Sequence, residues 1–281
     1  MSTRLDAVQA KIDDKELGAL LVSNLVNLRW LTGFTGSNGA ALVGTSRPRF
    51  VTDFRYLTQA ATQIDDIWVR EIETDLLQRV VDGLPEGSLK LGFDDAHLTV
   101  AQHERLRKLV GERGDDIELV AAGGIIEALR AVKDAAEIDR IRAAARLADE
   151  AFEEVVGAGI VGRTEKDVAL DLEIAMRRRG ADGSSFSPIV AAGEHGALPH
   201  AVPRDVPIMA GTLVVIDWGA QLDGYASDCT RTVATGELDP RDRAIYDTVL
   251  DAQEAALEAI RAGPTGQEID AIARAIIDDS G

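Results

Sequence analysis

The chain contains the stretch Leu213-Val-Val-Ile-Asp-Trp-Gly-Ala-Gln-Leu-Asp-Gly-Tyr-Ala-Ser-Asp-Cys-Thr-Arg-Thr232, which is typical of a β-hairpin. Its first part, 213–220, is apolar and partly β-branched, and 225–233 is a second candidate strand. Between them lies Asp223-Gly224, a dipeptide that is among the strongest short-range signals for a hairpin turn. The stretch therefore predicts two antiparallel strands joined by a tight turn.

Two aspartates of this hairpin, Asp217 and Asp228, are expected to lie opposite each other. Pairing them places the turn centre between Leu222 and Asp223, at the turn residues. Directly opposed residues point to one face with Cβ atoms about 5 Å apart, and like charges placed so destabilise the pair. A divalent cation would remove the repulsion, because hard carboxylate oxygens suit such ions. The alternative is a slipped register, which leaves two unrelated acids in a chain with 48 Asp and Glu residues.

Composition limits the possible partners and the cellular compartment. The chain has 281 residues, 46% of them hydrophobic, which is enough for one large domain or two ordinary ones. A net charge of −18 argues against nucleic acid or an anionic membrane as a partner, since both require a cationic surface. The single cysteine, Cys229, excludes an intrachain disulfide and a cysteine-based zinc site. With no signal peptide or membrane-spanning apolar run, the sequence predicts a soluble cytoplasmic protein.

The first half of the chain alternates between helix and strand patterns, which is typical of an α/β domain. Helices are predicted at 2–14 and 99–112, and strands at 18–23, 40–44, 49–52, 67–71 and 89–93. Near 125–133 this alternation gives way to long amphipathic helical patterns. We therefore expect an N-terminal domain over 1–127 and a second domain over 128–281.

The second half predicts long helices around the hairpin, so that the whole chain is of the α/β (α+β) class. Asp134 begins a capping box that opens an amphipathic helix to about 157. A second helix runs from Thr164 to 179, and a strand over 187–192 is followed by a loop to Pro207. Further helices are predicted at 240–261 and 265–278.

The loop before the hairpin contains His200, which lies between Pro199 and Pro203. A lone histidine in a loop is usually exposed and without function. A neutral imidazole close to a metal-bound water or a developing oxyanion is, however, a common catalytic arrangement. The aspartate pair that follows in the sequence makes His200 a candidate catalytic residue.

Several spaced motifs carry a family resemblance. They are Ser185-Phe-Ser-Pro-Ile-Val-Ala-Ala-Gly193, Ala197-Leu-Pro-His200, Val215-Ile-Asp-Trp-Gly-Ala220 and Asp223-Gly-Tyr-Ala-Ser-Asp-Cys-Thr-Arg-Thr232. Together they resemble the metal-dependent peptidase family of proline dipeptidases and Xaa-Pro aminopeptidases, whose catalytic domain has the pita-bread fold. In the first half, Leu31-Thr-Gly-Phe-Thr-Gly-Ser-Asn-Gly39 and Thr52-Asp-Phe-Arg-Tyr56 are similar to the creatinase-like N-terminal domain of that family.

The resemblance implies a role for each matching residue. Asp217 would coordinate one metal ion and Asp228 would bridge two, while Thr230 would lie in the second layer around them. His200 would contact the substrate and stabilise the reacting carbonyl or tetrahedral intermediate. The implied cofactors are two divalent ions, with Mn²⁺ favoured and Zn²⁺ or Co²⁺ possible. The implied substrates are proline-containing di- or oligopeptides, with dipeptidase and aminopeptidase activity both open, and a homodimer is expected.

The resemblance also implies three further metal ligands, a histidine and two glutamates, that have no counterpart in this chain. No histidine follows Gly236. We therefore expect an incomplete pita-bread domain and a 281-residue chain that is inactive by itself. Three explanations are open: a fragment of a longer peptidase, a short form that has lost activity, or a fold completed by another chain or protomer. The alternative function is a non-catalytic peptide- or protein-binding module of the same fold.

Overall fold

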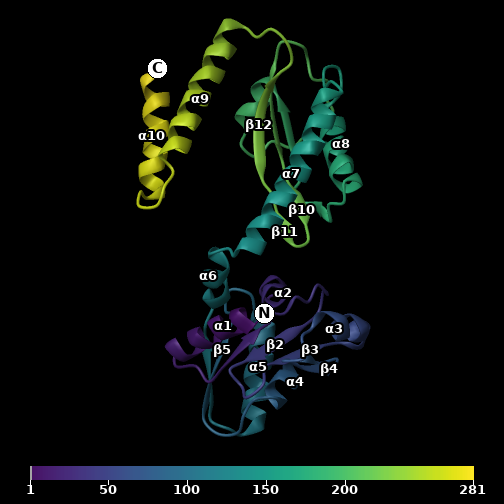
Figure 1. The fold of residues 1–281 in the computed structure, drawn as a ribbon, viewed down its shortest axis with the longest axis vertical. Coiled ribbons are helices and arrows are strands. Elements are labelled where there is room, and N and C mark those ends of the chain that lie inside the picture. The colour runs from purple at the N-terminus through teal and green to yellow at the C-terminus, as the bar shows by residue number, and fades with distance from the viewer. Residues whose placement is uncertain (1) are drawn as a thin grey trace. The chain divides into compact units, whose positions relative to one another are not determined.

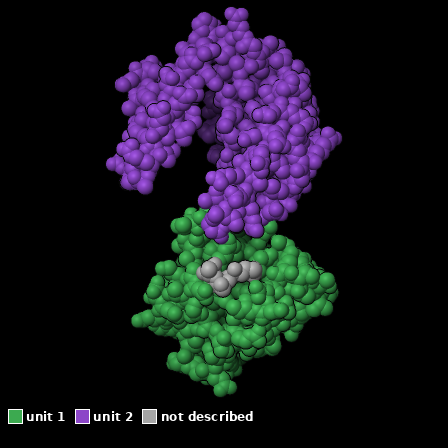
Figure 2. Space-filling view, viewed as in Figure 1, with its two compact units in different colours: residues 1–133 green, residues 134–281 purple. Residues whose placement is uncertain are grey.

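The computed structural model describes residues 2–281, with side chains from Arg4 onward. The chain forms two compact units, Met1–Lys133 and Asp134–Gly281 (Figure 2). Each unit has its own buried apolar core, and the described cores share no residue.

A six-stranded mixed sheet forms the centre of the first unit, in the order β4-β3-β2-β1-β5-β6 (Figure 1). The strands are β1 (Ala19–Val22), β2 (Ala40–Val43), β3 (Arg49–Thr52), β4 (Val69–Ile72), β5 (Leu89–Phe93) and β6 (Ile117–Ala121). The helices are α1 (Ser2–Asp14), α2 (Leu25–Thr32), α3 (Leu57–Gln63), α4 (Leu76–Asp82), α5 (Val100–Arg113) and α6 (Ile125–Ala131), with a short 3-10 helix at Phe54–Tyr56.

Both faces of this sheet are buried, because helices cover each of them. Successive side chains of a strand point to opposite faces. Leu20 of β1 accordingly packs in a cluster with α1, α2 and α6, whereas the adjacent Leu21 packs in a cluster with α4 and α5. The strands β1 and β2 are buried at every position, which is why they read as continuous apolar runs in the sequence.

The second unit contains two three-stranded sheets, in the orders β12-β9-β8 and β11-β10-β7. Its strands are β7 (Gly183–Ser184), β8 (Ile189–Ala192), β9 (Leu213–Trp218), β10 (Ala220–Leu222), β11 (Tyr225–Ala226) and β12 (Cys229–Ala234). Its helices are α7 (Ala135–Gly157), α8 (Glu165–Arg178), α9 (Pro240–Ala259) and α10 (Gly266–Asp279), with the 3-10 helix η2 (Gly193–Ala197).

Helix α7 begins at the predicted capping box and supports the hairpin. The Glu137 N–H donates to Asp134 Oδ1 at 2.8 Å, and the Asp134 N–H donates to Glu137 Oε2 at 2.9 Å. Further along α7, Phe152 stacks on Trp218 of β9 with ring centroids 4.3 Å apart. The Trp218 indole also donates to the Ala148 carbonyl at 2.8 Å. One face of β9 is thereby fixed against α7.

Helices α9 and α10 pack on each other at the end of the chain (Figure 1). Only Ala252 of α9, and no residue of α10, is buried. Their large exposed apolar side chains are Ile245, Val249, Leu250, Leu257 and Ile277. No helix among residues 2–281 combines the length and the apolar character that crossing a membrane requires.

The predicted hairpin forms, but its predicted register is wrong. Strand β12 pairs with β9 so that Thr230, and not Asp228, lies opposite Asp217. Asp223 and Gly224 have φ values of 50° and 78°, so both are central residues of the two-residue turn. Such a turn requires φ above zero at both central positions. The turn centre therefore lies between Asp223 and Gly224, one position later than expected, which shifts the partner of Asp217 by two residues.

Candidate active site

Asp217 lies in the middle strand of the β12-β9-β8 sheet, on the face that α7 does not cover. Its neighbours Ile216 and Trp218 are 0% and 1% exposed and point into the core, so the alternation of the strand turns Asp217 to the opposite face. There it is half-buried, with Ile189 of β8 and Thr230 of β12 as its cross-strand partners.

The Asp217 carboxylate is bound by a hydroxyl and lies near a second acid. Thr230 Oγ1 donates to Asp217 Oδ1 at 2.8 Å. Burial raises the pKa of Asp217, the hydrogen bond from Thr230 lowers it, and the charge of Asp228 raises it again, so that the net shift is upward. The two acids therefore interact, although they are not directly opposite each other.

Gly219 fixes the place of Asp228 in the hairpin. The Ser227 N–H donates to the Ala220 carbonyl at 2.9 Å, so the same register places Asp228 opposite Gly219, diagonal to Asp217. A Cβ at Gly219 would lie 2.0 Å from the Ser227 carbonyl oxygen. Only glycine allows this close approach. Diagonal neighbours are within reach of a shared ligand, because their Cα atoms are about 7–8 Å apart.

The donor set fits a divalent cation in part. Carboxylate and hydroxyl oxygens are the hard ligands that Mg²⁺, Ca²⁺ and Mn²⁺ prefer. The part of the chain that the structure describes contains no group of three or more His, Cys, Asp or Glu residues arranged to hold a metal ion. Asp217 and Asp228 are thus two oxygen-bearing side chains on one face of the hairpin, fewer than such a group requires.

His200 lies in the loop between η2 and β9, where its side chain is exposed. It belongs to a turn that the Ala201 N–H closes by donating to the Leu198 carbonyl at 3.1 Å. The loop starts on the sheet, since Gly196 of η2 packs against Val215 of β9. Val215 points to the same face as Asp217, so the segment that leads to His200 is anchored on the face that carries the aspartate.

Three residues that sequence reasoning missed hold this loop. Glu165, the first residue of α8, has a side chain that is only 1% exposed and contacts both His195 and Arg204. Burial raises the pKa of Glu165, but hydrogen bonds from Arg204, the Ala192 N–H and His195 outweigh it and lower the pKa to about 2. Locally, Glu165 reads as an ordinary acid in the first turn of a helix, so its only sequence signal was the capping motif around Thr164.

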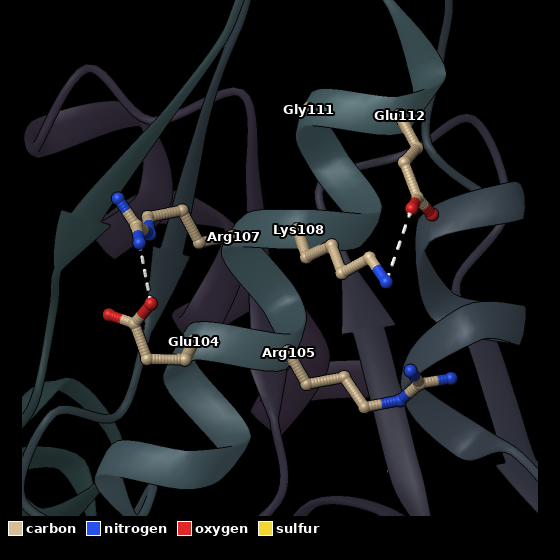
Figure 3. A pocket seen from close by; sticks show the side chains of 6 residues that line it. All are labelled: Glu104, Arg105, Arg107, Lys108, Gly111 and Glu112. Carbon is tan, nitrogen blue, oxygen red and sulfur yellow. Dashed lines mark hydrogen bonds and ion pairs between the residues drawn. The ribbon is translucent and has the colours of Figure 1, made fainter.

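A hollow on the first unit offers no comparable chemistry. It follows one exposed face of α5, and four of its charged side chains form two pairs with each other (Figure 3). Arg107 pairs with Glu104 at 2.5 Å and Lys108 with Glu112 at 3.6 Å, while Arg105 bonds Asp75 at the start of α4. Because a single helix lines the hollow and its cations are neutralised, we assign it no function.

The chain has two domains, with two acids on one open sheet face of the second, and comparison with known proteins identifies its class as a metallopeptidase. Residues 139–281 match the metallopeptidase family M24, and residues 4–132 match the creatinase/prolidase N-terminal domain. The chain belongs to the metallopeptidase family M24. The resemblance stated from the motifs is thereby confirmed, as are the pita-bread and creatinase-like folds, and the family implies a divalent metal cofactor.

Named relatives and solved structures agree with this assignment. The uncharacterized peptidase YqhT of Bacillus subtilis is 40% identical over 92% of this chain and 72% of its own length. The Xaa-Pro dipeptidase of Bacillus anthracis superposes with a TM-score of 0.91 at 34% identity, covering 100% of this chain and 78% of that one. The X-Pro aminopeptidase of Thermotoga maritima gives 0.86 at 31% identity, covering 95% and 76%.

Proposed function

We propose that this chain carries part of an active site that hydrolyses the peptide bond before proline, with Asp217 and Asp228 as metal ligands. The observation that carries the proposal is the open sheet face on which Asp217, bonded to Thr230, lies diagonal to Asp228. Similar proteins named Xaa-Pro dipeptidase and X-Pro aminopeptidase support the substrate class. The substrates are then di- or oligopeptides with proline in the second position.

Each residue has a distinct task in this proposal. Asp217 would hold one divalent ion and Asp228 would be shared between two, and such ions would activate water and polarise the scissile carbonyl. Thr230 fixes the orientation of the Asp217 carboxylate through its 2.8 Å hydrogen bond and leaves Oδ2 for a metal. His200 contacts the substrate and donates a hydrogen bond to the oxygen on which negative charge develops.

The proposal also covers the ion, the assembly and the compartment. Mn²⁺ is proposed because the ligands are carboxylates, with Zn²⁺ or Co²⁺ as substitutes. A homodimer and a cytoplasmic location are part of the same proposal. The single cysteine, Cys229, suits a reducing compartment.

The two carboxylates are fewer ligands than a dinuclear centre requires. We therefore expect residues 1–281 by themselves to bind metal weakly and to show little or no turnover. The chain spans 78% of the length of the similar Xaa-Pro dipeptidase of Bacillus anthracis.

A hydrolysis assay tests the proposal. The 281-residue chain, verified by intact mass, is incubated with Mn²⁺ and matched Xaa-Pro and Xaa-Ala peptides of two and five residues. We expect slow or absent turnover, confined to the Xaa-Pro peptides and abolished by Asp217→Asn. Rapid turnover would contradict the incomplete site, and cleavage of Xaa-Ala peptides would contradict the substrate class. Binding of proline peptides by a metal-free, inactive chain would instead indicate a non-catalytic binding module.

A further inference from the structure

The buried carboxylate of Glu165 joins the two ends of the loop that carries His200. We call these ends, Ala192 and Arg204, the neck of the loop. The Ala192 N–H donates to Glu165 Oε1 at 3.0 Å, and the Arg204 N–H donates to Glu165 Oε2 at 2.8 Å. These two amides lie at opposite ends of the segment 192–204. The Glu165 side chain thus joins the two ends of the loop, and His200 lies between them.

Side chains complete the shell around this carboxylate. Arg204 donates from Nε to Oε2 at 3.1 Å and from Nη2 to Oε1 at 2.8 Å, and His195 Nδ1 lies 3.1 Å from Oε2. Both oxygens of Glu165 therefore have several partners. A buried carboxylate is costly unless its lone pairs are satisfied in this way, and charge-assisted hydrogen bonds of this kind are the strong ones.

Both ends of the loop also have backbone support, since Ala192 is the last residue of β8 and pairs with Val214 of β9. Arg204 is also held by the backbone, because its carbonyl accepts from the Lys166 N–H at 3.2 Å and Val206 accepts from the Glu165 N–H at 3.2 Å. Between the ends, Leu198 is 57% exposed and His200 is exposed, whereas Ala201 is 4% exposed. Since the segment around His200 buries little of its own surface, its conformation depends on the neck as well as on the packing of η2 against β9.

We propose that Glu165 is a positioning residue that holds the His200 loop in place over the sheet. The proposal rests on the role of His200 in the proposed function. A neutral amide of the same shape cannot replace the carboxylate, because each carboxylate oxygen accepts hydrogen bonds from two of the four surrounding N–H groups and an amide has only one oxygen. In Glu165→Gln the amide NH₂ would face two of these donors, so about half of the hydrogen bonds would be lost.

The test compares Glu165→Gln with a matched variant on the same helix. Asp171→Asn removes the ion pair of Asp171 with Arg163, at 2.5 Å, without touching the loop. In Glu165→Gln we expect the amides of Ala192 and Arg204 to exchange hydrogen about 10-fold faster, with β9 and β12 unchanged. In Asp171→Asn we expect all of these rates to stay as in the wild type.

The ring signals of His200 provide a readout that a general loss of stability would not move. In the NMR spectrum of the metal-free chain we expect Glu165→Gln to shift the His200 ring signals, assigned by His200→Gln. The signals of His97 and His103, which lie in the first unit, should stay in place. Should Glu165→Gln fail to fold, Arg204→Gln serves instead, since it removes the guanidinium bonds but keeps the backbone bond to Oε2.

Two results would overturn the positioning role. One is an unchanged His200 signal in a variant whose neck hydrogen bonds are broken. The other is faster exchange of β9 and β12 in parallel with the loop, which would show that Glu165 only stabilises the unit. Neither readout involves metal or peptide, so a failure of the proposed hydrolysis would leave this result as it stands.

Discussion

Thr230 donates a hydrogen bond to Asp217, and this contact affects the pKa of the Asp217 carboxyl. The raised pKa of Asp217 means that the folded chain favours its ionised form less than an unfolded chain does. A carboxyl whose folded pKa lies above its ordinary value stabilises the fold less as the pH rises through that range. In the metal-free chain, Asp217 therefore opposes folding at neutral pH, and this cost decreases as the pH falls through its folded pKa and is gone below the ordinary value of 3.8.

Replacing Thr230 with valine should increase this shift. The hydrogen bond from Thr230 stabilises the ionised carboxylate, so Thr230→Val is expected to raise the pKa of Asp217 further. A carboxyl ¹³C titration by NMR measures it. Thr232→Val, on the same strand but opposite Val215, is the control and should leave the pKa of Asp217 unchanged. An unchanged or lower Asp217 pKa in Thr230→Val would show that the hydroxyl does not bind the carboxylate in solution.

The hairpin as an element depends on Gly219. A Cβ there would lie 2.0 Å from the Ser227 carbonyl oxygen and 2.2 Å from Ser185 Oγ. Because the first contact is with backbone, Gly219→Ala must displace the strand that carries Asp228. We expect a loss of about 1–3 kcal/mol in the free energy of unfolding, measured by urea denaturation. Gly183→Ala, whose Cβ meets only the end of Arg177 at 3.4 Å, should cost clearly less; equal losses would contradict the crowding at Gly219.

Glu165, at the start of α8, should make the free energy of unfolding of the second unit depend on pH in the acid range. The pKa of Glu165 is lowered to about 2, so its stabilising effect is fully present above the ordinary value of 4.5 and is lost as the pH falls toward 2. We expect the wild type to exceed Glu165→Gln in free energy of unfolding at pH 6, and the difference to shrink steadily between pH 4.5 and pH 2. Urea denaturation at a series of pH values measures it. A difference that stays constant over this range would mean that Glu165 is not ionised in the fold.

The sequence predicted most elements, and its errors have physical causes. The hairpin was found from Asp223-Gly224, but its register was wrong because the turn centre was placed before both residues, between Leu222 and Asp223, and not between Asp223 and Gly224. A two-residue turn of this kind has φ above zero at both central positions, so taking Asp223 and Gly224 as those positions would have paired Asp217 with Thr230, as observed. Helix α2 was missed although both of its signals are present: the Asn24 side chain accepts from the Val26 N–H, and Gly33 ends the helix with φ of 83°.

At the scale of the whole molecule, the family could be recognised from sequence because its motifs are local and spaced along both halves of the chain. The Glu165 contacts could not be predicted. Glu165 and Arg204 are far apart in sequence, and each has an unremarkable local setting: an acid in the first turn of a helix and a basic residue in a loop. Only the fold brings Arg204, His195 and the Ala192 N–H to one carboxylate.

Titration calorimetry with Mn²⁺ tests the central claim, that Asp217 and Asp228 form a metal pair. The wild-type 281-residue chain is compared with Asp217→Asn and Asp228→Asn. The control is Asp223→Asn, because Asp223 lies in the turn at positive φ, a conformation that asparagine also adopts. We predict weak binding to the wild type and to Asp223→Asn, and affinity at least about 10-fold lower in the other two variants. Equal affinity in all four proteins would contradict the claim.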